Sequence, residues 1–125
     1  MIPFRVEFCA GIPVYEQVVY AVKKAVVSGS LKPGDRFPSV RTLSQELRIN
    51  PNTAHKVVAA LVSEGLLEVQ PGIGTLVAQG RPATRQQRKE LLGGELERLV
   101  VETRNLGLEL DDLTQALQQH WQRLL

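Results

Sequence analysis

Three polar residues, Asn52, His55 and Lys56, lie close together in a segment that the sequence predicts to be helical. Asn50 supplies the short side-chain acceptor that caps a first helical turn, and Pro51 fits the first helical position, where no N–H is needed. Apolar residues recur behind them at three- and four-residue spacing, as in the buried stripe of a helix. These apolar residues are Ala54, Val57, Val58 and Leu61.

The opposite face of this predicted helix offers hydrogen-bond donors and a cation but no acid. It holds Asn52, His55, Lys56 and Ala59. A solvated surface helix usually mixes Glu with Lys, whereas a face without carboxylates suits a polyanion. We therefore interpret this face as a DNA-reading surface, and an ordinary exposed helix is the alternative.

The segments on either side predict a winged helix-turn-helix. Upstream, Ser39 can cap a short amphipathic helix that carries Val40, Leu43 and Leu47. About two residues then separate that helix from Asn50, which is helix-turn-helix spacing.

Downstream, Gly65 can end the second helix, and a hairpin is predicted to follow. Two β-prone runs, 66–70 and 75–77, flank a Pro-Gly-Ile-Gly turn that contains Gly72. The hairpin tip can lie against a phosphate backbone or in a minor groove. The order helix, helix, hairpin is that of a winged helix-turn-helix.

A further helix is predicted over residues 14–27 and acts as scaffold. Its apolar face is β-branched but has helical spacing. That face consists of Tyr15, Val18, Val19, Val22 and Val26. Before it, residues 4–8 alternate like a short strand or arm, to which we assign no role.

Five motifs lie in register across roughly residues 10–78. They are Tyr15-Glu16-Gln17-Val18, Gly29-Ser30-Leu31-Lys32-Pro33-Gly34-Asp35-Arg36-Phe37-Pro38-Ser39-Val40-Arg41, Asn50-Pro51-Asn52-Thr53, Glu64-Gly65-Leu66-Leu67 and Gly72-Ile73-Gly74-Thr75-Leu76-Val77. Together they resemble the GntR family of bacterial transcription regulators. The Asn-Pro-Asn-Thr start and the short C-terminal tail are similar to the YtrA-like subgroup.

The resemblance implies that the Arg after Pro-Ser-x, the first residues of the recognition helix and the wing-tip Gly contact the operator. By position these residues are Arg41, Asn50, Asn52, Thr53, His55 and Gly72. Many members of the family carry Arg where this chain has His55. Lys56, on the same polar face, is expected to contact mainly phosphate.

Length and charge agree with this interpretation. A chain of 125 residues holds one compact domain plus a small appendage, and its net charge is +2. We expect a DNA-binding domain over 1–80 and a dimerisation segment over 81–125. Cations cluster at the junction, ahead of the first acid of the second half; they are Arg81, Arg85, Arg88 and Lys89. This cluster is either a solvated helix start or a set of phosphate contacts.

The last third of the chain is predicted to form two helices. Leu92, Leu99 and Leu106 recur every seven residues, with Leu96 and Thr103 between them. Gly107 can end the first of these helices, and Asp111 or Asp112 can cap the second. Within the first, the pair Gly93-Gly94 indicates a kink or a close helix crossing.

Two such short helices are too small to form a core of their own. They either fold back on the winged domain or pair with a second copy of the chain. We favour pairing because of the seven-residue spacing and because the resemblance implies a dimer. The expected interface consists of Leu92, Leu96, Leu99, Leu106, Leu113, Leu117 and Trp121.

The sequence gives no sign of catalysis, a metal or a cofactor. His55 and His120 have no partner ligands at metal spacing. No Ser or Cys stands in a nucleophile motif, and the single cysteine, Cys9, excludes a disulfide framework. We expect Cys9 to be a small apolar filler, and we expect that the protein is not an enzyme.

The chain has no apolar run of about eighteen residues and no signal-peptide pattern, so it predicts a cytoplasmic protein without a membrane partner. The predicted fold is mainly α with a small β wing: a winged helix-turn-helix followed by a short two-helix dimerisation segment.

The predicted function is that of a homodimeric transcription regulator, a repressor that binds an inverted-repeat operator in double-stranded DNA. No small-molecule effector is identified. The alternative is a winged-helix protein–protein interaction module without specific DNA binding. The Asn/His/Lys face argues against that alternative, because protein interfaces favour apolar and aromatic anchors.

Overall fold

The computed structural model describes residues 2–125 and is mainly helical with one small antiparallel sheet, as predicted. Its elements are α1 (Val14–Val27), α2 (Val40–Leu47), α3 (Pro51–Ser63), β1 (Leu67–Gln70), β2 (Gly74–Val77), α4 (Arg85–Lys89), the π-helix η1 (Glu90–Glu95), α5 (Leu96–Asn105) and α6 (Leu110–Arg123). The chain divides into two compact units, Met1–Gly80 and Arg81–Leu125.

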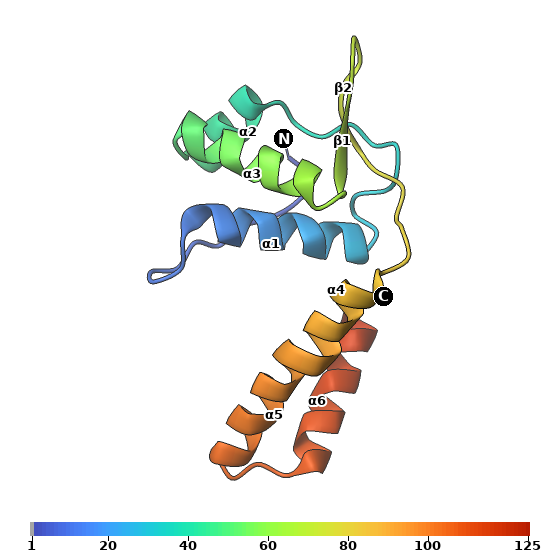
Figure 1. Ribbon diagram of the computed structural model, residues 1–125. Helices are drawn as coiled ribbons and strands as arrows, with labels where there is room; N and C mark the ends of the chain where they lie inside the picture. Colours follow the sequence, from blue (N-terminus) through green and yellow to red (C-terminus); the bar gives the residue numbers. More distant parts are fainter. Residues whose placement is uncertain (1) are drawn as a thin grey trace. The chain divides into compact units, whose positions relative to one another are not determined.

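The first unit is built around α3, which lies between α1 and α2 (Figure 1). The predicted bounds of α1 are confirmed, and Tyr15 and Val26 lie at the margin of its buried face. The side chains that fill the core come from all three helices, from the loop between α1 and α2, and from both strands. They are Val18, Val19, Val22, Ala25, Leu31, Phe37, Leu43, Ala54, Val57, Leu61, Leu67 and Val77.

The turn between α2 and α3 has the predicted length. After Leu47, only Arg48 and Ile49 precede Asn50, the N-cap of α3. Arg48 has φ 54° and ψ 48°, a left-handed conformation that L-residues with long side chains adopt at a cost. This residue redirects the chain from one helix into the next.

The wing is a hairpin with register Leu67↔Val77 and Gln70↔Gly74. The first strand begins one residue later than predicted, the second begins one residue earlier, and both end where predicted. The loop between α1 and α2 extends the sheet on the free edge of β2. There the N–H of Phe37 donates to the carbonyl of Thr75 at 2.8 Å, and the N–H of Val77 donates to the carbonyl of Asp35 at 2.8 Å. The loop thereby ties the wing to the helices.

The N-terminal segment is anchored to the first unit, but it is not a strand. Phe4 stacks on Phe37 with ring centroids 6.0 Å apart, and Val6 packs against the core. The side-chain amide of Gln17 donates to the carbonyls of Cys9 and Ile12, and its oxygen accepts from the N–H of Cys9. The expectation that Cys9 is an apolar filler is wrong, because its side chain is exposed beside this polar clamp.

In the second unit, α4, η1 and α5 follow one another without a break. Gly93-Gly94 lies inside η1, so the structure contains a wide helical turn at the position where the sequence indicated a kink or crossing. The cap of α6 was predicted wrongly. Glu109 is the N-cap, and Asp112 takes the third helical position, where its carboxylate accepts from the N–H of Glu109 at 2.8 Å.

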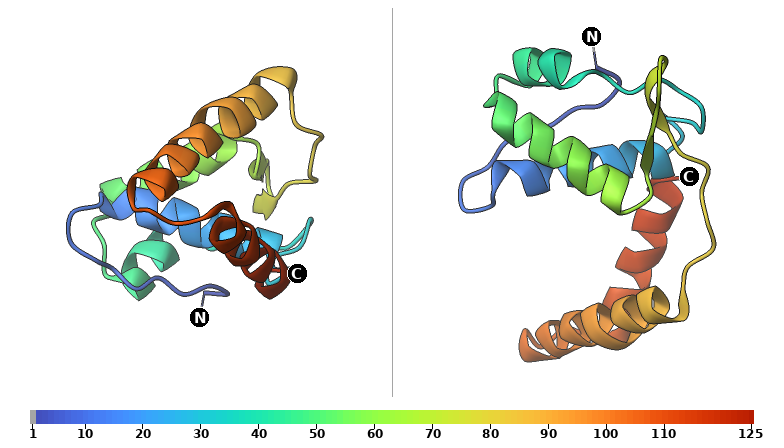
Figure 2. Two further views of the ribbon diagram at one scale, coloured as in Figure 1. Left: turned by 90° about the horizontal axis from the view of Figure 1, so that it is seen from below. Right: turned by 45° about the horizontal axis from the view of Figure 1, so that its top comes forward.

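The second unit has almost no interior of its own. Thr103 is its only buried residue within Arg81–Leu125, and its hydroxyl donates to the carbonyl of Leu99 at 2.7 Å. Figure 2 shows that α6 runs back at an angle to α5. Most of the large apolar side chains of the two helices are exposed in the single chain, among them Leu99 and Trp121.

Candidate nucleic-acid interface

The start of α3 presents the predicted polar face. The side-chain oxygen of Asn50 accepts from the N–H of Asn52 at 2.8 Å, which leaves the amide group of Asn50 free to donate outward. Asn52 and His55 are exposed, and Thr53 is half-buried. On the opposite side Ala54, Val57 and Leu61 are fully buried, so packing fixes which face of α3 is exposed.

Lys56 is exposed, but its side chain contacts an aromatic ring. Its Nζ lies 3.9 Å from the centroid of the Tyr15 ring, near the start of α1. A cation over an aromatic face is attracted by the ring quadrupole, which is worth about 0.5–1 kcal/mol at an exposed site. The contact holds the ammonium group at the edge of the polar face and joins α1 to α3.

Arg41 is the second residue of α2 and is exposed. Ser39 caps this helix by accepting from the N–H of Thr42 at 3.1 Å, and it also donates to the hydroxyl of Thr42 at 3.0 Å. The cap fixes the first turn of α2. The backbone that carries the Arg41 guanidinium is therefore fixed at the start of α2, and Arg41 precedes Pro51, the first residue of α3, by ten residues.

The wing tip places Gly72 in a tight turn, with φ 78°, a conformation that favours glycine. The N–H of Ile73 donates to the carbonyl of Gln70 at 3.0 Å and closes this turn. Figure 1 shows the tip extending away from the helices of the first unit. No Cβ shields the backbone at Gly72, so its peptide groups are open to a phosphate.

The charge along α3 also suits a polyanion. Residues 51–63 contain no acid, and the first one, Glu64, follows the last turn of the helix. Its carboxylate pairs with Lys23 at 2.7 Å, at the end of α3 opposite to Asn50. The start of α3 is the positive end of its dipole, and Lys56, the sixth of its thirteen residues, lies in the same half of the helix.

The predicted contacts of the first unit are exposed or half-buried residues of α2, of the start of α3 and of the wing tip. Tyr15 is the residue that sequence reasoning missed, because it was assigned only to the apolar face of α1. No periodic signal links it to Lys56, which lies forty-one residues away on another helix. The available signal was that Tyr15 is the one aromatic residue on an otherwise aliphatic helix face, and an aromatic ring can bind a cation.

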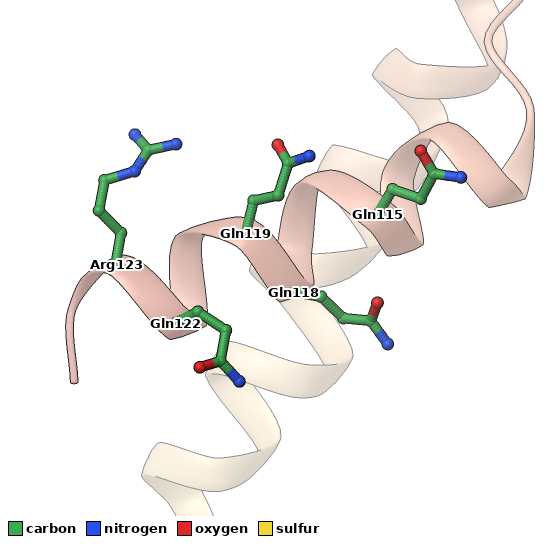
Figure 3. Close-up of a pocket in the computed structure, with 5 residues that line it drawn as sticks. All are labelled: Gln115, Gln118, Gln119, Gln122 and Arg123. Atoms are coloured by element: carbon green, nitrogen blue, oxygen red, sulfur yellow. The ribbon is translucent and has the colours of Figure 1, made fainter.

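The second unit carries a shallow pocket on α6 that does not resemble a catalytic site. Its lining residues are Gln115, Gln118, Gln119, Gln122 and Arg123, and Figure 3 shows Gln118 and Gln122 projecting to a different side of the helix from the other three. Amides and a guanidinium offer no general acid, base or nucleophile near neutral pH. Among residues 2–125 there is no group of three side chains that suits a metal ion, and no helix is long and apolar enough to cross a membrane.

A helix-turn-helix with a paired wing and an exposed, acid-free start of its second helix defines the class of winged helix-turn-helix DNA-binding proteins. The sequence model of the bacterial regulatory proteins of the gntR family matches residues 14–77, about half of the chain. The chain belongs to the GntR family. It is therefore a DNA-binding transcription regulator and not an enzyme.

Three proteins to which this chain is similar agree with its family membership or its fold. The HTH-type transcriptional repressor YtrA of Bacillus subtilis is 34% identical over 102 residues, which are 81% of this chain and 78% of that protein. A transcriptional antiterminator from Listeria monocytogenes shares the fold with TM-score 0.88 and 24% identity, over 97% of this chain and 91% of that one. The DNA-binding domain of AraR, solved in complex with operator ORX1, is 30% identical with TM-score 0.54, over 59% of this chain and 95% of that one.

Proposed function

We propose that this chain is a homodimeric transcriptional repressor that binds an inverted-repeat operator. The observation that carries the proposal is the polar, acid-free start of α3, exposed on one side and fixed by buried apolar residues on the other. The AraR domain, similar in fold and 30% identical, is bound to an operator in its own structure. The YtrA relative is a repressor.

In this proposal the start of α3 enters a major groove, as recognition helices of this class do. Asn52 and His55 contact base edges, since an amide and an imidazole both offer groups that pair with purine acceptors and donors. Lys56 contacts phosphate from its place beside Tyr15. Asn50 and Thr53 complete the contact surface at the helix start.

Two further contacts frame the groove. Arg41 lies on the start of α2, where a guanidinium can bind a base edge or a phosphate with two parallel hydrogen bonds. Gly72 lets the backbone of the wing tip approach the sugar-phosphate chain closely. The winged unit over 1–80 is thus the DNA-binding domain of the proposal.

The second unit, 81–125, is the dimerisation segment of the proposal. Its large apolar side chains are exposed in the single chain, Leu99 to 48% and Trp121 to 69%. Exposed apolar patches of this kind mark protein interfaces. The proposed interface consists of Leu92, Leu96, Leu99, Leu106, Leu113, Leu117 and Trp121.

Selection of binding sites from random duplex DNA tests the proposal. We expect an inverted repeat with half-site centres about one helical turn, or a multiple of it, apart. A single unrepeated site contradicts the dimer, and the absence of any enriched sequence favours a protein-binding module instead. Placing the selected operator over a promoter then tests repression, because transcription by RNA polymerase in vitro should fall as the protein is added.

A further inference from the structure

Charge is divided sharply within the second unit. Residues 81–89 contain four cations and no acid, a net charge of +4. Residues 90–125 contain three cations and seven acids, a net charge of −4. The boundary falls between Lys89 and Glu90, where α4 passes into η1.

The cations of α4 share one side of the helix. Arg85, Arg88 and Lys89 stand at positions i, i+3 and i+4, which are neighbours on a helix surface. Thr84 and Gln87 form a reciprocal capping box, each side chain accepting from the other residue's N–H at 3.0 Å. The box fixes the backbone of the first turn of α4, so the spacing of these cations along the helix is set from its start.

All four cations of this segment are exposed, and none has an ion-pair or hydrogen-bond partner for its side chain among residues 2–125. The nearest acid, Glu90, accepts instead from the side-chain amide of Gln86 at 2.9 Å. The segment Arg81–Lys89 is therefore a cluster of like charges without neutralisation inside the chain. Such a cluster repels itself unless an anion lies nearby.

We propose that Arg81, Arg85, Arg88 and Lys89 form a second phosphate-binding surface, the basic segment, which grips the DNA backbone next to the half-site read by α3. This inference rests on the proposed function, because it needs the first unit on DNA. It extends the contact surface beyond the winged domain and assigns a role to the junction between the two units.

The length of the linker supports the proposal. Strand β2 of the wing ends at Val77 and α4 begins at Arg85, eight residues later. An extended chain spans at most about 3.6 Å per residue, so the first turn of α4 stays within about 29 Å of the wing. One turn of DNA is about 34–36 Å long. Val77 is at the base of the wing, and from the tip at Gly72 to Arg85 the chain spans at most about 47 Å. A wing tip on the backbone therefore leaves the basic segment able to reach phosphates on the same stretch of duplex.

The acidic residues after Lys89 fit the same picture. Residues 90–125 carry seven acids, so DNA repels the helices that they form. The basic segment is therefore the last part of the chain whose charge suits contact with DNA. A different occupant, the acidic helices of a second copy, would also neutralise these cations. Arginine, which supplies three of the four, is especially suited to phosphate because its planar fork can bind two oxygens at once.

The test compares two charge-matched triple variants of the full chain. The first carries Arg85→Gln, Arg88→Gln and Lys89→Gln in the basic segment. The control carries Arg98→Gln, Arg104→Gln and Arg123→Gln in the acidic part. Glutamine keeps helix propensity close to that of Arg and Lys. Binding to a labelled operator duplex and to an unrelated duplex is measured by fluorescence anisotropy from 50 to 300 mM salt, a range of about sixfold chosen to resolve the slope.

We expect the slope of log K against log salt to fall by about 0.9 for each lost phosphate contact per protomer in the first variant, on both duplexes, and to be unchanged in the control. An unchanged slope in the first variant, with the intact protein binding the operator, overturns the basic segment but leaves the proposed function standing. Failure of the intact protein to bind any duplex overturns the proposed function itself. Sedimentation completes the test: a first variant that dissociates into monomers, while the control remains a dimer, assigns the cations to the second copy and overturns the proposal.

Discussion

Lys56 contacts another side chain of the protein before it meets any partner. A free lysine side chain has about 2 kcal/mol of rotamer entropy, part of which is lost when it binds a fixed phosphate. The Tyr15 ring beneath its Nζ restricts the side chain already in the free protein. Lys56 therefore needs less ordering on binding than the exposed cations that have no such support.

At Arg41 we predict a loss of operator affinity without a loss of fold. Arg41→Ala should weaken operator binding by about 1–3 kcal/mol, since it removes the charged DNA contact that we propose at the start of α2. The side chain is exposed, so the unfolding midpoint should not change. Arg98→Ala on α5 is the control that removes the same charge. Unchanged affinity for the Arg41 variant in a folded protein removes this residue from the contact surface.

At His55 and Lys56 we predict two distinguishable defects. His55→Ala, like Asn52→Ala, should change the ranking of single-base operator variants, because our proposal places both side chains at base edges. Lys56→Ala should weaken all sequences alike and lower the salt slope by about one. Titration of a panel of operator variants measures both. A His55→Ala protein that keeps the full ranking shows that the imidazole reads no base.

At the scale of elements, most helices could be predicted because the residues next to each helix end determine where it begins or stops. Pro13 and Ser28 bound α1, Ser39 caps α2, and Asn50 with Pro51 starts α3. Local side-chain hydrogen bonds and fixed φ angles set these ends, so the sequence alone reveals them.

The elements that were missed depend on contacts far along the chain or on competition between caps. Segment 34–37 pairs with β2 across some forty residues, which no local pattern encodes. At the start of α6, both Asp111 and Asp112 looked able to cap. The N-cap instead lies two residues before Asp111, at Glu109, because the side chains of Glu109 and Asp112 each accept from the other residue's backbone N–H. The wide turn η1 at Gly93-Gly94 was expected only as an irregularity.

The left-handed turn at Arg48 gives a prediction for the helix-turn-helix. Arg48→Val should lower the free energy of unfolding by about 1 kcal/mol relative to Arg48→Asn, because a β-branched side chain tolerates positive φ poorly while Asn adopts it readily. Both variants remove the same charge, so urea unfolding isolates the backbone effect. Equal stability of the two would mean that the turn relaxes out of this conformation.

At the scale of the whole molecule, we predict that the second unit determines the oligomeric state. Leu99→Asp should convert the proposed dimer to a monomer by placing an unpaired charge in the proposed interface. The control is Val101→Asp: Val101 is 60% exposed and lies on the other side of α5, two residues from Leu99. Sedimentation velocity of both proteins decides the matter. A Leu99→Asp protein that remains a tight dimer places the interface elsewhere.

A chain truncated after Gly80 should fold and remain monomeric. All twelve buried apolar side chains of the core lie within residues 1–80. Losing the second half-site removes an effectively intramolecular contact, so operator affinity should fall by roughly 10²–10⁴-fold. Thermal unfolding checks the fold, and titration against the inverted repeat and a single half-site checks the affinity. A truncated chain that still prefers the inverted repeat by a large factor contradicts the prediction.

The anchored N-terminal segment limits how this regulator can read DNA. In homeodomains a free N-terminal arm enters the minor groove beside the recognition helix and adds base pairs to the site. Here Phe4 stacks on Phe37, and the Gln17 clamp holds the backbone at Cys9 and Ile12, so residues 4–12 are committed to the protein's own surface. Minor-groove reagents should therefore reveal no protection that depends on this segment, and the bases that the regulator distinguishes should be those within reach of α2, α3 and the wing.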